Sequence, residues 1–247
     1  MTEETKNLPT AWEERLAQDA QNVASQEVPK IPQISLKGGI MAYQGVAVPG
    51  NKLPCIILGS AFQHRWYEKE FDPNNPATPA CFALSMSGDN MVPHEASPKP
   101  QSESCETCEN FKWGSDPKGG RGKACKAGRR FTVLPAAAVQ AGGVKKAEMA
   151  MLTCPVTSVR NWANYVNRLA SEYRRPPYAM LTEISLHPHL KNQIEVKFEA
   201  LGIVEDEESL ADIVNRLAMS ETILMAPYEF SESAERPAAD PNKKVKY

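Results

Sequence analysis

The alternation of apolar and polar residues divides this chain into short strand-like runs and a few helical segments. Apolar positions two apart predict strands at 34–43, 53–67, 81–86, 130–135 and 147–154. Two more alternating runs, 178–186 and 193–201, are separated by a short turn and predict a β-hairpin. The pattern therefore favours several short antiparallel strands.

Helical spacing of apolar residues appears in three places. The strongest is 157–173, where Thr157 or Ser158 can cap a helix whose apolar residues recur every three or four positions. A second helix is predicted over 206–219, with acidic residues in its first turn. A third, over 11–25, belongs to an N-terminal arm. Together with the strands, these segments predict an α+β fold with two or three helices.

One long segment, 87–128, has almost no apolar periodicity and is rich in Gly, Pro, Ser, Lys and Cys. A segment of this length without a core of its own needs a staple to be ordered. We interpret this segment as an insertion in a core that spans 31–229. An arm at 1–30 precedes the core, and a flexible tail at 230–247 follows it.

The composition is that of a soluble protein of a reducing compartment. No apolar run approaches the roughly 18 residues of a membrane span, and the first residues, Met-Thr-Glu-Glu-Thr-Lys-Asn, are polar. We therefore expect a cytoplasmic location and no membrane partner. There, the six cysteines are expected to be metal ligands or buried thiols instead of disulfides.

Three cysteines are spaced as zinc ligands. Cys105 and Cys108 form a Cys-x2-Cys pair, and Cys125 follows 17 residues later, between glycines and lysines. Two thiolates two residues apart bind one tetrahedral ion from a single turn, and distant ligands close the site. We predict one structural Zn²⁺. The alternative is a redox pair, but redox pairs sit at a helix N-terminus and this one lies in a polar loop.

The fourth ligand is Cys81 or His94. We favour Cys81, because it completes an all-thiolate site and begins the strand that leads into the insertion. Cys55 and Cys154 lie in apolar runs and are interpreted as small core residues.

The net charge is −2, yet the charge is uneven: 117–147 contains eight Lys and Arg residues and no acid. Basic side chains together with planar rings are typical of single-stranded nucleic-acid binding. The candidate contacts are Arg65, Trp66, Tyr67, Trp113, Lys118, Arg121, Lys123, Lys126, Arg129 and Arg130. Because the sequence has no phosphate-binding glycine motif and no recognisable catalytic histidine set, we expect a protein that is not an enzyme.

The stretch 81–130 carries a resemblance. It reads Cys-Phe-Ala-Leu-Ser, then Pro-Gln-Ser, Cys-Glu-Thr-Cys-Glu-Asn and Trp-Gly-Ser, then Gly-Lys-Ala-Cys-Lys and Arg-Arg. It resembles small proteins that tailed bacteriophages encode near their replication and recombination genes. In architecture it is also similar to zinc-containing single-stranded DNA-binding phage proteins, which carry an OB-fold with a zinc subdomain between strands.

The resemblance implies an OB-like antiparallel barrel that coats single-stranded DNA in the host cytoplasm and works with replication or recombination proteins. It makes Cys81, Cys105, Cys108 and Cys125 the ligands and places Arg129 and Arg130 on the basic rim. One departure is the basic chain end, Asn242 to Tyr247, where many single-strand binders are acidic. The alternatives are a zinc-stapled adaptor for a host polymerase or nuclease, with the acidic helix as contact face, and, third, a metal-dependent nuclease.

Overall fold

The structure, a computed structural model, describes residues 12, 15, 16, 18, 19, 31–68, 78–189 and 193–228. The chain forms two units, Met1–Ile31 and Pro32–Tyr247, which are described separately. In the first unit residues 12, 15, 16, 18 and 19 are helical, within the predicted arm helix. The predicted tail, 230–247, lies outside the described residues.

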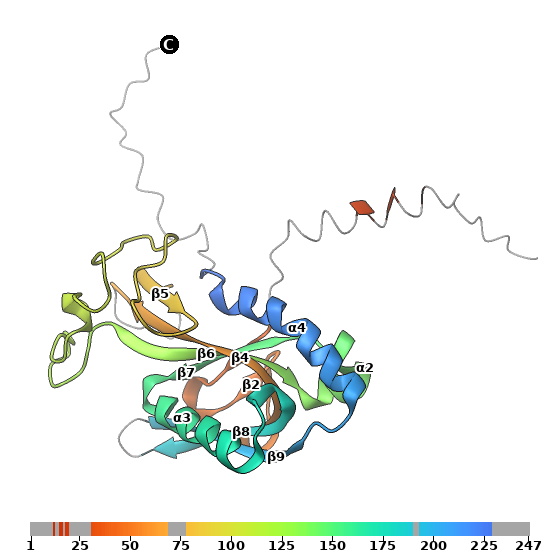
Figure 1. The fold of residues 1–247 in the computed structure, drawn as a ribbon. Coiled ribbons are helices and arrows are strands. Elements are labelled where there is room, and N and C mark those ends of the chain that lie inside the picture. The colour runs from red at the N-terminus through yellow and green to blue at the C-terminus, as the bar shows by residue number, and fades with distance from the viewer. Residues whose placement is uncertain are drawn as a thin grey trace, which may run out of the picture. The chain divides into compact units, whose positions relative to one another are not determined.

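A curled, mixed sheet forms the framework of the second unit (Figure 1). Its strands are β1 (Gln33–Ser35), β2 (Ala42–Tyr43), β3 (Val46–Ala47), β4 (Lys52–Trp66), β5 (Cys81–Ser85), β6 (Lys126–Pro135), β7 (Ala150–Pro155), β8 (Met180–His189) and β9 (Gln193–Ile203). The strand order is β3-β2-β1-β7-β6-β4-β8-β9, and β5 pairs with β4 beside this path. The pairing of β1 with β7 is parallel, which corrects the prediction of a purely antiparallel sheet.

Three helices accompany the sheet: α2 (Ala136–Lys146), α3 (Val159–Arg168) and α4 (Glu207–Met225). A π-helical turn, η5 (Leu169–Tyr173), continues α3, and short 3-10 turns lie at η1 (Lys37–Gly39), η2 (Pro49–Asn51), η3 (Glu109–Phe111), η4 (Val156–Ser158) and η6 (Pro177–Ala179). The α+β class is therefore confirmed. None of the helices in the described ranges has the length and apolar character that crossing a bilayer requires.

The concave face of the sheet encloses the main core. The Phe131 ring of β6 lies 4.7 Å from the Trp162 ring of α3 and 5.6 Å from that of Phe198 on β9. The rings of Phe131, Trp162 and Phe198 are all buried. The burial of Trp162 agrees with the helical spacing of apolar residues over 157–173. The hydroxyls of Tyr165 and Thr182 are 2.6 Å apart, so the helix is also tied to β8.

The other face of β4 and β6 is covered by α4 (Figure 1). The helix approaches closely at Gly59, where an added Cβ would lie 3.0 Å from a Leu224 methyl group. A hydrogen bond between Thr132 and Ser220 joins β6 to α4 at the same level. α4 therefore covers this face of the sheet. The cysteine-bearing segment lies between β5 and β6.

Two elements differ from the sequence-based expectation. The expected strand at 34–43 is broken into β1 and β2 by η1, where Gly38 and Gly39 adopt positive φ angles. The helix α2 was not predicted. Residues 86–125, all described, contain only the turn η3 as regular structure, and we call this segment the insertion.

Candidate metal centre and nucleic-acid interface

Four of the six cysteines lie around one small cavity, where the insertion joins β5 and β6. Cys81 begins β5, Cys105 and Cys108 lie within the insertion, and Cys125 immediately precedes β6. All four side chains are buried and line the same cavity of about 20 Å³. That volume holds roughly one water-sized sphere, which is also the scale of a single ion.

Backbone hydrogen bonds bring the cysteines together. Cys81 is paired with Trp66 across β5 and β4. The Cys105 N–H donates to the Met91 carbonyl at 2.9 Å, and the Cys125 N–H donates to the Asn110 carbonyl at 2.7 Å. Three separate stretches of chain therefore deliver thiols to one place.

Three of the four thiols are hard to ionise in this position. Burial, followed by the neighbouring cysteines, raises the pKa of Cys105 to about 11 and the pKa of Cys125 to about 12. Burial also raises the pKa of Cys81. Desolvation and the neighbouring thiols both oppose thiolate formation, so at neutral pH Cys81, Cys105 and Cys125 hold their protons unless a cation compensates the charge. A bound Zn²⁺ would provide that compensation, with release of the thiol protons.

All six cysteines are free thiols, and Cys55 and Cys154 are buried in the main core, which confirms their interpretation as core residues. In the described part of the chain, no three His, Cys, Asp or Glu side chains are arranged as ligands of one metal ion. The four cysteines share a cavity wall without converging on a single point. The zinc ion therefore stays a prediction.

His94, the alternative fourth ligand, lies outside this cavity. It lines a neighbouring open cavity with Val92 and Glu95. Its Nδ1 accepts a hydrogen bond from the Ala96 N–H at 3.1 Å, and its ring stacks on Phe82 with centroids 5.0 Å apart. The structure thus groups Cys81, and not His94, with the other three cysteines.

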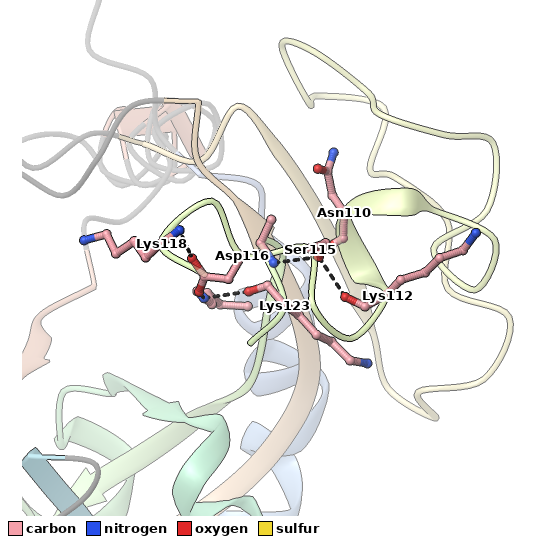
Figure 2. A network of polar contacts seen from close by, with 8 residues as sticks. Asn110, Lys112, Ser115, Asp116, Lys118 and Lys123 are labelled. Atoms are coloured by element: carbon pink, nitrogen blue, oxygen red, sulfur yellow. Dashed lines mark hydrogen bonds and ion pairs between the residues drawn. The ribbon is translucent and has the colours of Figure 1, made fainter. Parts of the chain in front are cut away.

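A basic loop, residues 112–126, projects from the cysteine cavity. It contains five basic residues and one acid. Figure 2 shows the Ser115 hydroxyl at its centre, where it donates to the Lys112 carbonyl at 2.7 Å and accepts from the Ala124 N–H at 2.9 Å. The Gly114 N–H donates to the Gly122 carbonyl at 2.9 Å. The two arms of the loop are therefore joined by hydrogen bonds, and the loop is an ordered turn.

The single acid of the basic loop supports this turn. Asp116 accepts from the Lys118 N–H at 3.1 Å and pairs with the Lys126 ammonium (Figure 2). The hydrogen bond from Lys126 is the largest reason why the pKa of Asp116 is lowered. Gly122 packs against this carboxylate, because a Cβ there would approach its oxygen to 2.9 Å.

The predicted nucleic-acid contacts separate into two groups. Lys118, Arg121, Lys126 and Trp113 are exposed on the basic loop, and Lys123 is half-buried there. Arg65, Trp66 and Tyr67 lie half-buried at the end of β4, and Trp66 lines the cysteine cavity.

Arg129 and Arg130 are engaged in internal contacts. Arg129 lies 3.6 Å above the Phe62 ring and donates to the Ser60 hydroxyl. Arg130 is only 2% exposed. Its guanidinium donates to Gln63 and to the carbonyl oxygens of Leu224 and Ala226. Arg130 is thus a cap for the end of α4, and we leave it out of the candidate surface.

The acidic segment is partly used inside the fold. The Asp206 carboxylate caps α4 by accepting from the Ser209 N–H at 2.8 Å. Asp212 lies 3.4 Å from the Lys145 ammonium of α2, and Glu208 lies 3.8 Å from it. These contacts reduce the acidic face that the adaptor hypothesis requires.

Sequence reasoning missed Phe111, and His64 is not among the predicted nucleic-acid contacts. Their rings are 4.1 Å apart, and both line the cysteine cavity. His64 and Trp66 are two residues apart on β4 and therefore lie on one face of the strand, but no local signal in the sequence placed η3 against that face.

The comparisons with known proteins give no relative. The sequence matches no protein-family profile, no curated protein and no solved structure.

Proposed function

We propose that this protein binds single-stranded DNA through the basic loop, and that a structural zinc ion holds this loop in place. The observation that carries the proposal is the position of the loop. An ordered turn with five basic residues and one acid stands directly on a cavity lined by four buried cysteines.

The cysteine cavity supports zinc through the chemistry of its donors. Four thiols are the donor set of a closed structural zinc site. The backbone delivers all four thiols to one cavity, so the proposal requires their side chains to turn toward a common ion there. No open coordination position is required, since the ion acts as a staple and not as a catalyst.

The strand connections support an OB-like barrel. β4 pairs with both β6 and β8, β6 continues to β7, α3 follows β7, and β8 pairs with β9. OB-folds are five-stranded Greek-key barrels that bind oligonucleotides on their second and third strands and on the loops after strands one and four. If β4, β6, β7, β8 and β9 are these strands, the insertion belongs to the first of those loops. The strands β1, β2 and β3 are then additions.

The basic loop matches single strands better than an adaptor partner. Cationic side chains bind phosphates of any sequence, and exposed rings take unpaired bases. A protein-binding surface is instead depleted in lysine at its centre, whereas the loop carries four lysines.

Binding is tested by titrating fluorescent oligo-dT and a duplex of equal length at several salt concentrations. We expect preference for the single strand and a steep loss of affinity with salt. If the loop makes about three to four phosphate contacts, the logarithmic slope is roughly −2 to −3. Absence of binding at low salt contradicts the proposal.

A matched pair of double variants locates the contact. Lys118→Ala with Arg121→Ala removes two exposed cations of the basic loop, whereas Lys145→Ala with Lys146→Ala removes two cations of α2 from the same acid-free stretch. We expect only the first pair to flatten the salt dependence. Equal effects of both pairs would place the binding surface elsewhere.

A further inference from the structure

Trp113 is the most exposed of the large apolar side chains in the described ranges, at 78%. Exposing an indole to water is unfavourable because its large apolar ring remains hydrated. Trp113 also lies on an ordered turn and not on a loose end: the next residue, Gly114, donates its N–H to Gly122 at 2.9 Å. The ring is therefore presented to solvent from a fixed base.

A row of stacked groups supports this ring from behind. The Lys123 ammonium lies 4.9 Å from the centroid of Trp113 and 3.6 Å from that of Phe111. The Phe111 ring in turn lies 4.1 Å from the His64 ring of β4. Cation–π attraction orients Lys123 between the two rings. The row connects the exposed indole to the wall of the cysteine cavity.

Trp113 also borders an open cavity of about 390 Å³, together with Gly114, Gly120 and Arg121. This is at the small end of the roughly 300–1,000 Å³ range of ligand sites. Gly114 and Gly120 have φ angles of 86° and 81°, which side-chain-bearing residues rarely adopt. The walls are consequently one flat ring, bare backbone and one guanidinium.

These walls suit a planar group that is joined to an anion. The indole offers a stacking face, the two glycines leave room beside it, and Arg121 supplies a fixed positive charge. In a duplex the base faces are covered by their neighbours, so only an unpaired base can stack on the indole. Apolar peptides would leave the guanidinium unused.

We propose that Trp113 and Arg121 form a stacking site for one unpaired nucleobase, with the adjoining phosphate on Arg121. This site rests on the proposed binding of single-stranded DNA and names the part of the ligand that the loop recognises beyond charge. The row from His64 to Lys123 makes the position of the ring depend on the cysteine cavity.

The test compares oligo-dT with an abasic oligonucleotide of equal length and charge. The wild-type protein should bind oligo-dT more tightly. Base stacking on an aromatic ring contributes about 1–3 kcal/mol, so Trp113→Ala should weaken oligo-dT binding by roughly 5- to 150-fold. Binding of the abasic strand should stay within about twofold, because its phosphate contacts remain. Trp113→Phe should recover part of the loss.

The matched control is Trp12→Ala. Trp12 is 53% exposed and also lies near a cation, with Arg15 5.7 Å from its ring. This variant should keep the wild-type preference for oligo-dT, and a loss of preference would overturn the assignment to Trp113.

The failures are distinguishable. If Trp113→Ala binds both strands like the wild type, the stacking site is wrong and the phosphate contacts stand. Equal losses on both strands also exclude stacking. If the wild type binds neither strand at low salt, the proposed function falls together with the site.

Discussion

The curled sheet with its core, a partial barrel that we call the barrel, and the insertion are held together in different ways. Eighteen buried side chains of the described residues form the main core, including a group of aromatic rings around Phe131. In the insertion, Met91 and Cys105 form a small cluster with Ala83 of β5, and Phe62 of β4 packs against it. Elsewhere the insertion is held by backbone hydrogen bonds of its turns, and the four thiols line the cavity at its base.

This difference teaches that the two regions respond to different perturbations. Burial of apolar surface stabilises the barrel at about 25 cal/mol per Å². The insertion contributes only a small apolar cluster, so the proposed zinc cross-link between distant cysteines would supply much of its order. A change in one region should therefore leave the other largely intact, and three pairs of variants test this separation.

The largest effect is expected from Phe131→Ala. The ring is fully buried among Trp162 and Phe198, so its removal should lower the free energy of unfolding by about 3–5 kcal/mol. Chemical denaturation followed by circular dichroism measures this loss. The matched variant is Phe111→Ala in the insertion, which should reduce DNA affinity with little change in the denaturation midpoint. Equal destabilisation by the two variants would contradict the comparison.

Arg130→Met should have the next largest effect. Methionine fills much of the space but leaves the Leu224 and Ala226 carbonyl oxygens without their donor. An unsatisfied buried group costs about 1–3 kcal/mol, so we expect a loss of about 2–3 kcal/mol in denaturation. The salt slope of DNA binding should not change. Arg121→Ala, by contrast, should reduce that slope by about one contact without lowering stability.

Cys125→Ser should have the smallest effect on the free energy of unfolding of the barrel. The variant should abolish zinc binding, measured by elemental analysis of the purified protein, and increase hydrogen exchange throughout 86–125. Protection of β6, β7 and β8 should remain, since their bonds lie in the barrel. Cys55→Ala, in the main core, serves as the control and should retain one zinc per chain. Full zinc content in Cys125→Ser would exclude this residue as a ligand.

The sequence was informative where local pattern and packing agree. The hairpin expected at 178–186 and 193–201 is found as β8 and β9, because alternating residues face the core on one side of a two-stranded unit. The helix at 157–173 is α3 with its π-helical extension, since Trp162 and Tyr165 lie on the face that packs against the sheet. The grouping of Cys81 with the other cysteines follows from its place at the start of β5.

The missed features depend on contacts between distant residues. α2 contains Gly142 and Gly143, lacks a side-chain cap and buries little beyond Val144. It packs against α4, β4 and β6, and Arg216 of α4 donates to the Ala147 carbonyl at its C-terminal end at 2.6 Å. Arg130 belongs to a basic run that suggests exposure, and only the docking of α4 buries it. No local property of the sequence reports where α4 lies.

The length of β4 has a mechanical consequence. The strand is bonded to β8 over its first residues, to β6 along most of its course and to β5 at its end. The same strand therefore belongs to both the barrel and the base of the insertion, without a hinge between them. A pulling force on the basic loop would reach β4 through the hydrogen bonds that β5 and β6 make with it, so that many bonds would share the load. The basic loop should consequently resist displacement relative to the barrel, because moving it requires many of these hydrogen bonds to break together.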